Sequence, residues 1–271
     1  MPVSRRTRPL PQGLLADLAA TRGLGLMLDY DGTLAEIVSD RAKAKPLPGI
    51  PELIDQIAAH DHRVAVAIIT GRRISEIRTL LEVRSPVFSS GVHGLEIGTR
   101  DGSTQFSPAA LACSSELDRV RQWLKDHTPP GRGFSIEDKQ VAVGLHYRNA
   151  DPQQARPLCA QFAEFVAHDA PSLKLLQLKM LLEAMPKAAG KDLAVRSFKD
   201  RLPRTFVSVY FGDDTTDEDA FGALDHDDFG VLVGAPRPSR ARYRVASPHA
   251  VARELRSLAS SFEDRASAGS N

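Results

Sequence analysis

Short apolar segments alternate with amphipathic segments along much of this chain, and this alternation constrains the fold more than any other feature. The apolar segments are rich in Val, Ile, Leu and Phe and span residues 24–28, 64–69, 206–211 and 229–233. Such runs are typical of parallel strands that are buried on both faces. Between them, apolar residues recur every three or four positions, which predicts helices around 50–58, 74–81 and 194–202. The sequence therefore predicts an α/β protein with a Rossmann-like, doubly wound parallel sheet.

The middle of the chain breaks this rhythm. After a PPGRG turn segment at 129–133, apolar and polar residues alternate at 134–137 and again at 141–147, as in a hairpin with one covered face. Helical patterns flank this hairpin, and two more apolar segments follow at 173–178 and 180–184. Consecutive antiparallel pairs do not fit within a parallel sheet, so we expect a second, inserted α+β domain with the order αββαββ.

These patterns predict the domain organisation. We assign residues 105–185 to the inserted domain and residues 22–104 and 186–265 to the core domain that surrounds it in the sequence. Residues 1–21 contain three arginines before the first predicted strand, and we expect a flexible N-terminal tail there.

Composition and charge exclude several classes of function. The chain has 271 residues, 42% of them hydrophobic, which is enough for a full core. Its formal net charge of +1 argues against nucleic acid as a partner, and no apolar run is long enough to span a membrane. The two cysteines lack the spacing of a metal site, and no secretory signal pattern is present. We therefore expect a cytoplasmic protein without a membrane partner.

Polar residues that suit phosphoryl chemistry follow the predicted strands. Asp29 and Asp31 stand where the strand in LMLDYDGTL ends, Thr70 follows the next strand, and Lys191 opens a helix. The acidic run GDDTTDED at 212–219 follows a further strand. Each segment alone has an ordinary explanation as a turn, a helix cap, a surface lysine or a solvated helix start. Together they place a nucleophile, an acid, a hydroxyl, a cation and a metal-binding group at the edge where α/β sheets bind ligands.

This set resembles the haloacid dehalogenase superfamily of phosphatases, whose pattern is DxDGT, then Ser or Thr, then Lys, then an acidic GDD-type motif. More narrowly, GDDTTDEDAF, SSGVHGLEI, SIEDK followed by LHYR, and LE-x-x-P at 182–186 are similar to segments of the trehalose-6-phosphate phosphatase family. The resemblance runs from about Leu24 to Val233. One position departs from it, since Met185 stands where related sequences usually carry an arginine before the proline.

The resemblance implies roles for the core residues. Asp29 is expected to attack phosphorus and form an aspartyl-phosphate. Asp31, expected to be protonated beside its neighbour, donates to the leaving oxygen and then takes a proton from the attacking water. Thr70 is expected to bind a phosphoryl oxygen, and Lys191 to offset the charge of the transition state.

Mg²⁺ is the cofactor that the resemblance implies, since this ion prefers oxygen ligands from few carboxylates. The expected ligands are Asp29, Asp213, Asp214, Asp217 and the backbone oxygen of Asp31. The residues expected around the phosphate are Gly32 and Thr33, through their loop amides, together with Gly71 and Arg72.

The inserted domain is expected to select the sugar. The resemblance implies a mobile cap in which Glu137, Lys139 and Glu183 contact the disaccharide, and Arg148 and His146 are weaker candidates for the same role. Glu137 and Lys139 stand two residues apart, so they fall on one face of a strand and offer an acceptor and donors for hydroxyl groups.

The function expected from these observations is Mg²⁺-dependent hydrolysis of trehalose 6-phosphate. One alternative keeps the chemistry and changes the ester to a sucrose, glycosyl-glycerate or hexose phosphate. A more remote alternative is a non-hydrolytic phospho-receiver, but such modules have about half this length and lack an acid two residues after the phosphorylated Asp. The expected partner is a small-molecule sugar phosphate, and a separate trehalose-6-phosphate synthase is a further candidate partner.

Overall fold

The computed structural model describes residues 7–38, 43–99 and 102–268, and its contacts divide the chain into two compact units. The core unit comprises residues 1–104 and 190–271, and the inserted unit comprises residues 105–189. The insert was expected to end at residue 185, but residues 186–189 also belong to the inserted unit rather than to the core. No helix in the described ranges is both long enough and apolar enough to cross a membrane.

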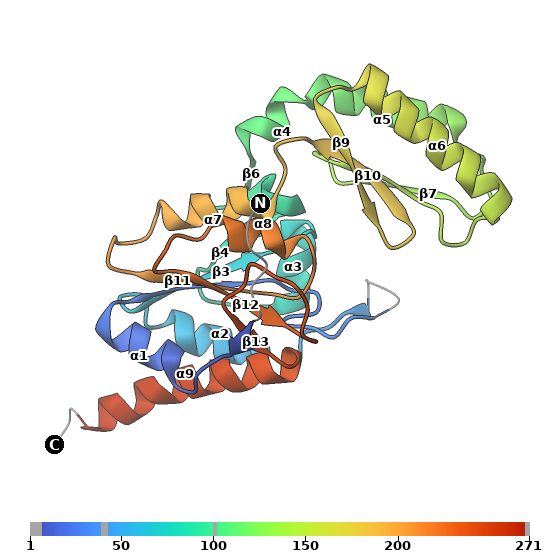
Figure 1. Ribbon diagram of the computed structural model, residues 1–271. Helices are drawn as coiled ribbons and strands as arrows, with labels where there is room; N and C mark the ends of the chain where they lie inside the picture. The colour runs from blue at the N-terminus through green and yellow to red at the C-terminus, as the bar shows by residue number, and fades with distance from the viewer. Residues whose placement is uncertain (1–6, 39–42, 100–101, 269–271) are drawn as a thin grey trace. The chain divides into compact units, whose positions relative to one another are not determined.

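The core unit is built on a mixed, mainly parallel sheet with the order β1-β13-β12-β11-β2-β3-β4-β5-β6 (Figure 1). The strands on one side of the centre are β2 (Leu24–Leu28), β3 (Val64–Ile69), β4 (Phe88–Gly91), β5 (Glu96–Gly98) and β6 (Thr104–Phe106). On the other side lie β11 (Val207–Gly212), β12 (Phe229–Val233), β13 (Tyr243–Val245) and β1 (Arg8–Pro9). The pairs from β1 to β4 are parallel, and β5 pairs antiparallel with β4. The doubly wound prediction is confirmed, with an antiparallel edge added.

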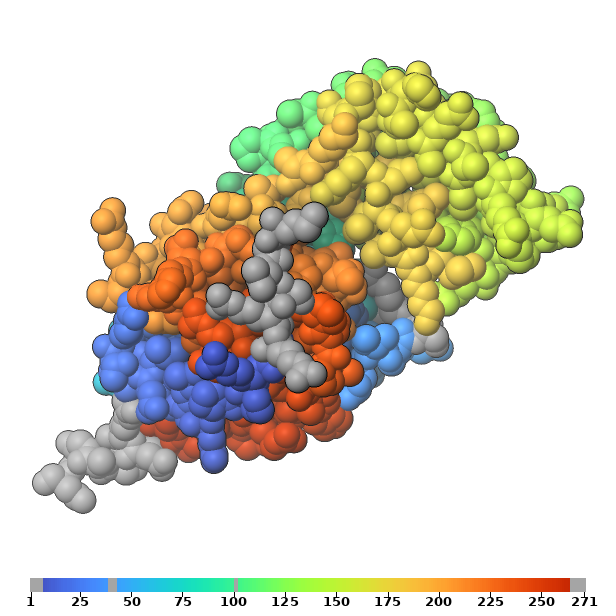
Figure 2. Space-filling view, in the orientation of Figure 1, coloured from blue at the N-terminus to red at the C-terminus, as the bar shows by residue number. Residues whose placement is uncertain are grey.

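Helices cover both faces of this sheet because its central strands are apolar on both faces. The helices of the core unit are α1 (Leu14–Thr21), α2 (Ile50–Ala58), α3 (Ile74–Leu81), α7 (Lys191–Lys199), α8 (Asp217–Gly222) and α9 (Pro248–Ala268). In β2, Leu26 and Leu28 pack with α1, α2 and α9, whereas Met27 faces the cluster formed by α7 and α8. Helix α9 contacts α1 and α2, so the first and last parts of the chain lie in one unit (Figures 1 and 2).

The prediction of a flexible tail is wrong for residues 8–21. Strand β1 pairs with β13, and α1 buries Leu15 and Ala19 in the main apolar cluster. The spacing of Leu14, Leu15 and Leu18 is helical, and this signal was masked by the arginines and prolines that precede it. Residues 1–6, the start of the predicted tail, lie outside the described residues.

The inserted unit has a core of its own. Its elements are α4 (Pro108–Ala112), α5 (Ser114–His127), β7 (Ser135–Asp138), β8 (Val143–His146), α6 (Pro152–Asp169), β9 (Leu173–Leu178) and β10 (Leu181–Pro186). The four strands form an antiparallel sheet with the order β7-β8-β10-β9. Apolar side chains of α5 and α6 pack on one face of this sheet, which includes Val143, Leu145 and Leu182. The opposite face carries Gly144 and Glu183, the residues that alternate with them.

Candidate active site

Strands β2 and β11 form the switch point of the core sheet. They are parallel neighbours, and from them the strand order runs outward in opposite directions. Asp29 follows the carboxyl end of β2 and Asp213 follows that of β11, and the Asp29 amide donates to the Phe211 carbonyl at 3.0 Å. Crevices at such switch points are where open α/β sheets bind ligands.

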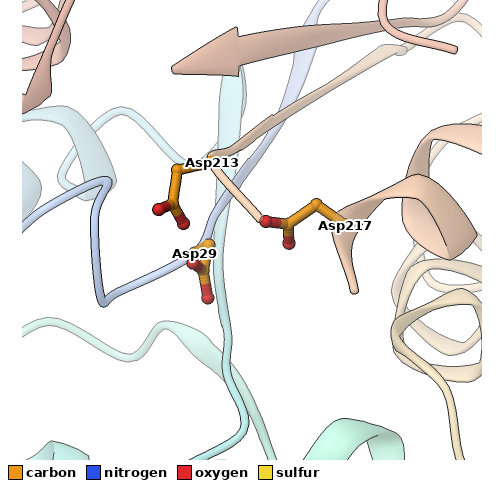
Figure 3. A group of neighbouring side chains, drawn as sticks. All are labelled: Asp29, Asp213 and Asp217. Atoms are coloured by element: carbon orange, nitrogen blue, oxygen red, sulfur yellow. The ribbon is translucent and has the colours of Figure 1, made fainter. Parts of the chain in front are cut away.

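Three carboxyl groups converge there. One oxygen from each of Asp29, Asp213 and Asp217 lies within 4.8 Å of the others, and Figure 3 shows the three side chains together. Asp217 comes from the first turn of α8, which begins five residues after β11 ends. Asp29 and Asp217 are buried, while Asp213 is half-buried. These residues therefore form an acidic group with one partly open side.

Lys191 enters this group from the first residue of α7. Its buried Nζ donates to Oδ1 of Asp29 at 2.8 Å and to Oδ1 of Asp217 at 2.6 Å. The Tyr210 hydroxyl donates to the same Asp217 oxygen at 2.7 Å, and the Asp214 amide donates to Asp217 Oδ2 at 2.9 Å. Asp217 is thus fixed by three donors and holds Lys191 against Asp29.

The electrostatics of the group follow from its burial. Burial raises the pKa of Asp29 well above its ordinary value; Lys191 opposes this rise, and Asp217 and Asp213 add to it. Burial, together with Asp217, raises the pKa of Asp213 to about 7. Burial lowers the pKa of Lys191, but Asp217 and Asp29 outweigh this effect and raise it overall. The lysine is therefore an ammonium ion at neutral pH.

This donor set fits a hard divalent cation. Three carboxylates face one ammonium, so the group is left with excess negative charge when all three are ionised. Carboxylate oxygens at this spacing are the ligand type that Mg²⁺ prefers, and a divalent charge would relieve the repulsion that raises the pKa of Asp213. Asp29, Asp213 and Asp217 are the side chains placed to hold such an ion.

Asp214 was expected among the metal ligands, but it is not one of the three residues whose carboxyl oxygens converge. Its Oδ1 accepts from the amide of Thr215 at 2.6 Å and from the Thr215 hydroxyl at 3.2 Å. Its backbone amide donates to Asp217 Oδ2, and its charge adds to the rise in the pKa of Asp213.

Asp31 and Arg72 form a bidentate ion pair beside this group. Arg72 Nε donates to Asp31 Oδ2 at 2.8 Å, and Nη2 donates to Oδ1 at 2.7 Å. The guanidinium is fully buried, donates to Glu76 through Nη1 and lies over the ring of Tyr30 with a 5.3 Å distance to its centroid. A fork of this kind binds a carboxylate rather than a carboxylic acid. Both oxygens of Asp31 are thus engaged by Arg72, and its expected role as an acid stays a prediction.

The same contacts correct the expected role of Arg72. We expected it to bind the phosphate, but its buried guanidinium is occupied by Asp31 and Glu76. Glu76 stands four residues after Arg72 in the sequence, and this spacing of opposite charges was the signal for the pair.

Thr70 lies where the sequence placed it, at the carboxyl end of β3. Its side chain is buried, and its Oγ1 accepts from the Arg72 amide at 3.2 Å. This contact uses a lone pair and leaves the hydroxyl hydrogen available for another acceptor. Gly71 follows in the same loop.

The loop after Asp29 does not present the amides that we expected. The Gly32 amide donates to the Ala35 carbonyl at 2.9 Å, and the Thr33 amide donates to the Tyr30 carbonyl at 3.2 Å. The loop closes on itself as a turn, so these two donors are used within it. Gly32 has a positive φ of 77°, and a Cβ there would lie 2.0 Å from an Asp213 oxygen, so only glycine fits beside Asp213. The buried Thr33 hydroxyl has no hydrogen-bond partner within the described part of the chain.

The inserted unit holds a second polar group on the face opposite its helices. In the strand register, Glu137 and Glu183 lie on either side of Gly144, which has no side chain to separate them. Lys139 Nζ lies 2.6 Å from Oε1 of Glu183 and 3.9 Å from Oε1 of Glu137. His146 Nε2 lies 2.9 Å from Oε2 of Glu137. The expected Glu137, Lys139 and Glu183 are thus brought together in one group.

Arg148, the remaining predicted sugar contact, lies apart from this group in the hydrogen-bond pattern. It is exposed in the turn after β8 and donates to the Lys179 carbonyl at 3.4 Å.

Sequence reasoning missed Tyr210 altogether. Tyr210 lies inside the apolar run of β11, where it reads as an ordinary core residue, but its buried hydroxyl fixes Asp217. Burial raises its pKa well above the ordinary value, and the negative charge of Asp217 adds to this rise, so it acts as a donor. Nothing in the sequence distinguishes it from the other aromatic residues of the core.

Comparison with known proteins places this site in a family. The profile of the Trehalose-phosphatase family matches residues 27–249. The chain is 30% identical over 261 residues to trehalose-phosphate phosphatase B of Arabidopsis thaliana, covering 90% of this chain and 68% of that protein. It is 29% identical over 280 residues to trehalose-phosphate phosphatase of Mycobacterium leprae, covering 96% of this chain and 64% of that one.

The fold also matches a solved structure. The C-terminal domain of Candida albicans trehalose-6-phosphate phosphatase superposes with a TM-score of 0.76 at 24% identity, covering 95% of this chain and 99% of that one. The profile match spans the carboxyl groups, the lysine and the inserted unit alike. The chain therefore belongs to the trehalose-phosphatase family, whose named members are phosphoric monoester hydrolases with a haloacid dehalogenase-like fold.

Proposed function

We propose that this protein hydrolyses trehalose 6-phosphate to trehalose and phosphate, with Mg²⁺ as cofactor and through an aspartyl-phosphate on Asp29. The observation that carries the proposal is the buried contact of Lys191 with Asp29 and Asp217, next to Asp213. The names of the family relatives support the substrate. The donor set of the three carboxyl groups supports the cofactor.

Asp29 is the proposed nucleophile. Lys191 engages Oδ1, and Oδ2 is left to attack phosphorus and displace the sugar oxygen. The attack forms an acyl phosphate on Asp29 and breaks the phosphorus–oxygen bond of the ester. Water then attacks the same phosphorus, which releases inorganic phosphate and restores the carboxylate. When bound, Mg²⁺ would supply positive charge for the phosphoryl oxygens, and Asp29, Asp213 and Asp217 would hold it.

Asp31 is the proposed acid and base. It protonates the leaving sugar oxygen in the first step and takes a proton from water in the second. Because both of its oxygens accept from Arg72, it must give up one of these bonds before it can serve in either step. The Thr70 hydroxyl and the Lys191 ammonium would bind phosphoryl oxygens and stabilise their charge in the transition state.

The polar face of the inserted unit is the proposed sugar-binding surface. Glu137, Lys139 and Glu183 offer carboxylate acceptors and ammonium donors on one face, as recognition of hydroxyl groups requires. Hydrolysis of a sucrose, glycosyl-glycerate or hexose phosphate would use the same core chemistry with other contacts on this face. A cytoplasmic location is proposed as well, because Cys113 and Cys159 are free thiols. A separate synthase that supplies the substrate is a proposed partner.

The test is release of phosphate from trehalose 6-phosphate, sucrose 6-phosphate, glucose 6-phosphate and p-nitrophenyl phosphate, with Mg²⁺ and with EDTA. We expect the highest kcat/KM for trehalose 6-phosphate and no turnover in EDTA. Asp29→Asn should abolish turnover of every ester, and it should still unfold cooperatively on heating, which shows that the variant is folded. Preference for another ester would overturn the substrate, and turnover by Asp29→Asn would overturn the covalent mechanism.

A further inference from the structure

The segment that follows β4 is joined to the loop that carries Thr70. The Thr70 amide donates to the Ser90 carbonyl at 2.9 Å, and the Val92 amide donates to the Arg72 carbonyl at 2.9 Å. The His93 amide donates in turn to the Thr70 carbonyl at 3.2 Å. Three backbone hydrogen bonds therefore tie residues 90–93 to the loop 70–72. His93 itself lies in a short 3₁₀ turn, η2 (Val92–Gly94).

His93 is also joined to the helix that carries the lysine. The Gly190 amide donates to the His93 carbonyl at 2.9 Å, and Gly190 directly precedes Lys191 at the start of α7. Through its own amide and carbonyl, His93 thus connects the backbone of Thr70 to the backbone beside Lys191. These are the two side chains that we propose to bind phosphoryl oxygens.

The backbone of this connection has an unusual conformation. Val92 has a φ of 46° and His93 a φ of 53°, so two consecutive residues other than glycine are left-handed. A β-branched residue is a genuine outlier in this region, because its side chain crowds the backbone. Such conformations persist where the surrounding contacts determine them, and they cluster at functional sites.

The imidazole of His93 packs against the loop after Thr70. A Cβ placed on Gly71 would lie 2.7 Å from both Cε1 and Nε2 of His93, so a side chain at residue 71 requires the ring to move. The His93 side chain is itself buried, with 7% of its surface exposed. The ring therefore fills the place that any other residue at position 71 would need.

We propose that His93 is a positioning residue for the phosphoryl site: its backbone sets the spacing between Thr70 and Lys191, and its ring, seated on Gly71, fixes the loop that carries Thr70. This inference rests on the proposed function, since it assumes that Thr70 and Lys191 bind the phosphoryl group. A displacement of about 1 Å at such a site is enough to cost on the order of 100-fold in rate.

The test compares four full-length variants with the wild type: His93→Gly, Gly71→Ala, the double variant Gly71→Ala/His93→Gly, and His226→Gly as a control. Glycine adopts a φ of 53° without strain, so His93→Gly removes the ring and keeps the backbone path. His226 is fully exposed in the turn before β12, at the opposite end of the strands from the carboxyl groups. The measurements are kcat and KM for p-nitrophenyl phosphate with Mg²⁺, the inhibition constant of inorganic phosphate, and the melting temperature.

We expect His93→Gly and Gly71→Ala each to lower kcat by about 10- to 100-fold and to weaken inhibition by phosphate, with melting temperatures within a few degrees of the wild type. The double variant should be no worse than the poorer single variant, because the added methyl no longer meets a ring. His226→Gly should match the wild type.

Two results would overturn the proposal. One is a wild-type kcat and phosphate inhibition in His93→Gly, and the other is a double variant whose loss equals the product of the two single losses. If His93→Gly does not fold, Gly71→Ala and His93→Asn carry the test, because asparagine also tolerates the left-handed region and should retain more activity than His93→Ala.

Failure of the proposed function gives a different pattern. The variants are compared on p-nitrophenyl phosphate, so the comparison still holds if the wild type prefers a sugar ester other than trehalose 6-phosphate. If the wild type turns over no ester at all, the proposed function fails, and calorimetric binding of inorganic phosphate with Mg²⁺ still reports on the Thr70–Lys191 spacing in each variant.

Discussion

Neutralising Asp213 should stabilise the metal-free protein while removing its response to Mg²⁺. Burial and the charge of Asp217 raise the pKa of Asp213 from its ordinary value of 3.8 to about 7. Because the folded state holds this proton more tightly than the unfolded state does, ionisation of Asp213 costs stability. That cost is absent near pH 4, grows as the pH rises, and is complete above about pH 7.

The magnitude follows from the size of the shift. About three pKa units correspond to ~4 kcal/mol, and solvent screening of this partly exposed carboxyl reduces the expected effect to ~2 kcal/mol. Units of 150–250 residues shift by roughly 2–4 °C per kcal/mol, so Asp213→Asn should raise the melting temperature by about 4–8 °C at pH 8 in EDTA. At pH 4.5 the difference should fall to about a quarter of this value, since the carboxyl of the folded wild type is then protonated while that of the unfolded chain is still mostly ionised.

The assay is thermal unfolding of the wild type and Asp213→Asn across this pH range, in EDTA and in Mg²⁺. Saturating Mg²⁺, at 100 times its Kd, should stabilise the wild type by about 2.7 kcal/mol and the variant far less. Asp214→Asn is the comparison variant: that carboxylate accepts from Thr215 and adds less than Asp217 does to the rise in the pKa of Asp213, so it should give a clearly smaller gain than Asp213→Asn at pH 8. A metal-free Asp213→Asn protein that is less stable than the wild type at pH 8 would refute the reasoning.

Three further predictions test other contacts of the site. Lys191→Met leaves Asp29 and Asp217 without their cation, so it should destabilise the metal-free protein by about 3–5 kcal/mol in thermal unfolding and lower kcat by 10²-fold or more; a stable, active variant would contradict this. Arg72→Lys loses the bidentate hold on Asp31, so kcat should fall more for trehalose 6-phosphate than for p-nitrophenyl phosphate, whose leaving group needs little protonation; equal losses would argue against the link to Asp31. Glu137→Ala should raise KM for trehalose 6-phosphate and leave the aryl phosphate unaffected, and a parallel loss on both substrates would remove Glu137 from sugar binding.

Much of the fold could be predicted because the burial of a segment determines which residues of its sequence must be apolar. A strand covered on both faces must be apolar at every position, as Leu24–Leu28 and Phe229–Val233 are. The same logic failed at the N-terminus, where α1 is short and follows a run of arginines and prolines. The apolar side of α1 is narrow, so the sequence pattern did not indicate that Leu15 and Ala19 are buried in the core.

The positions of Asp29, Thr70 and Lys191 could also be predicted, since each stands where an apolar strand or an opening helix brings it to the same edge of the sheet. The class of fold, the edge of the sheet that carries the polar residues and the types of those residues thus follow from the sequence. They do so because strand order and strand direction bring these ends together whatever the details of each loop.

Which of these groups contact one another depends on the packing of the folded chain. Asp217 and not Asp214 joins Asp29, because Asp217 opens α8 and accepts from Lys191 and Tyr210, whereas Oδ1 of Asp214 accepts from the neighbouring Thr215. Arg72 binds Asp31, which lies 41 residues away in the sequence, and the amide of Gly32 donates to a carbonyl within its own turn. Such pairings depend on side-chain directions and hydrogen-bond competition between segments remote in the chain. Neither can be inferred from residue type and spacing. The sequence therefore predicts which polar residues lie at the site, and the folded structure shows which of them contact one another.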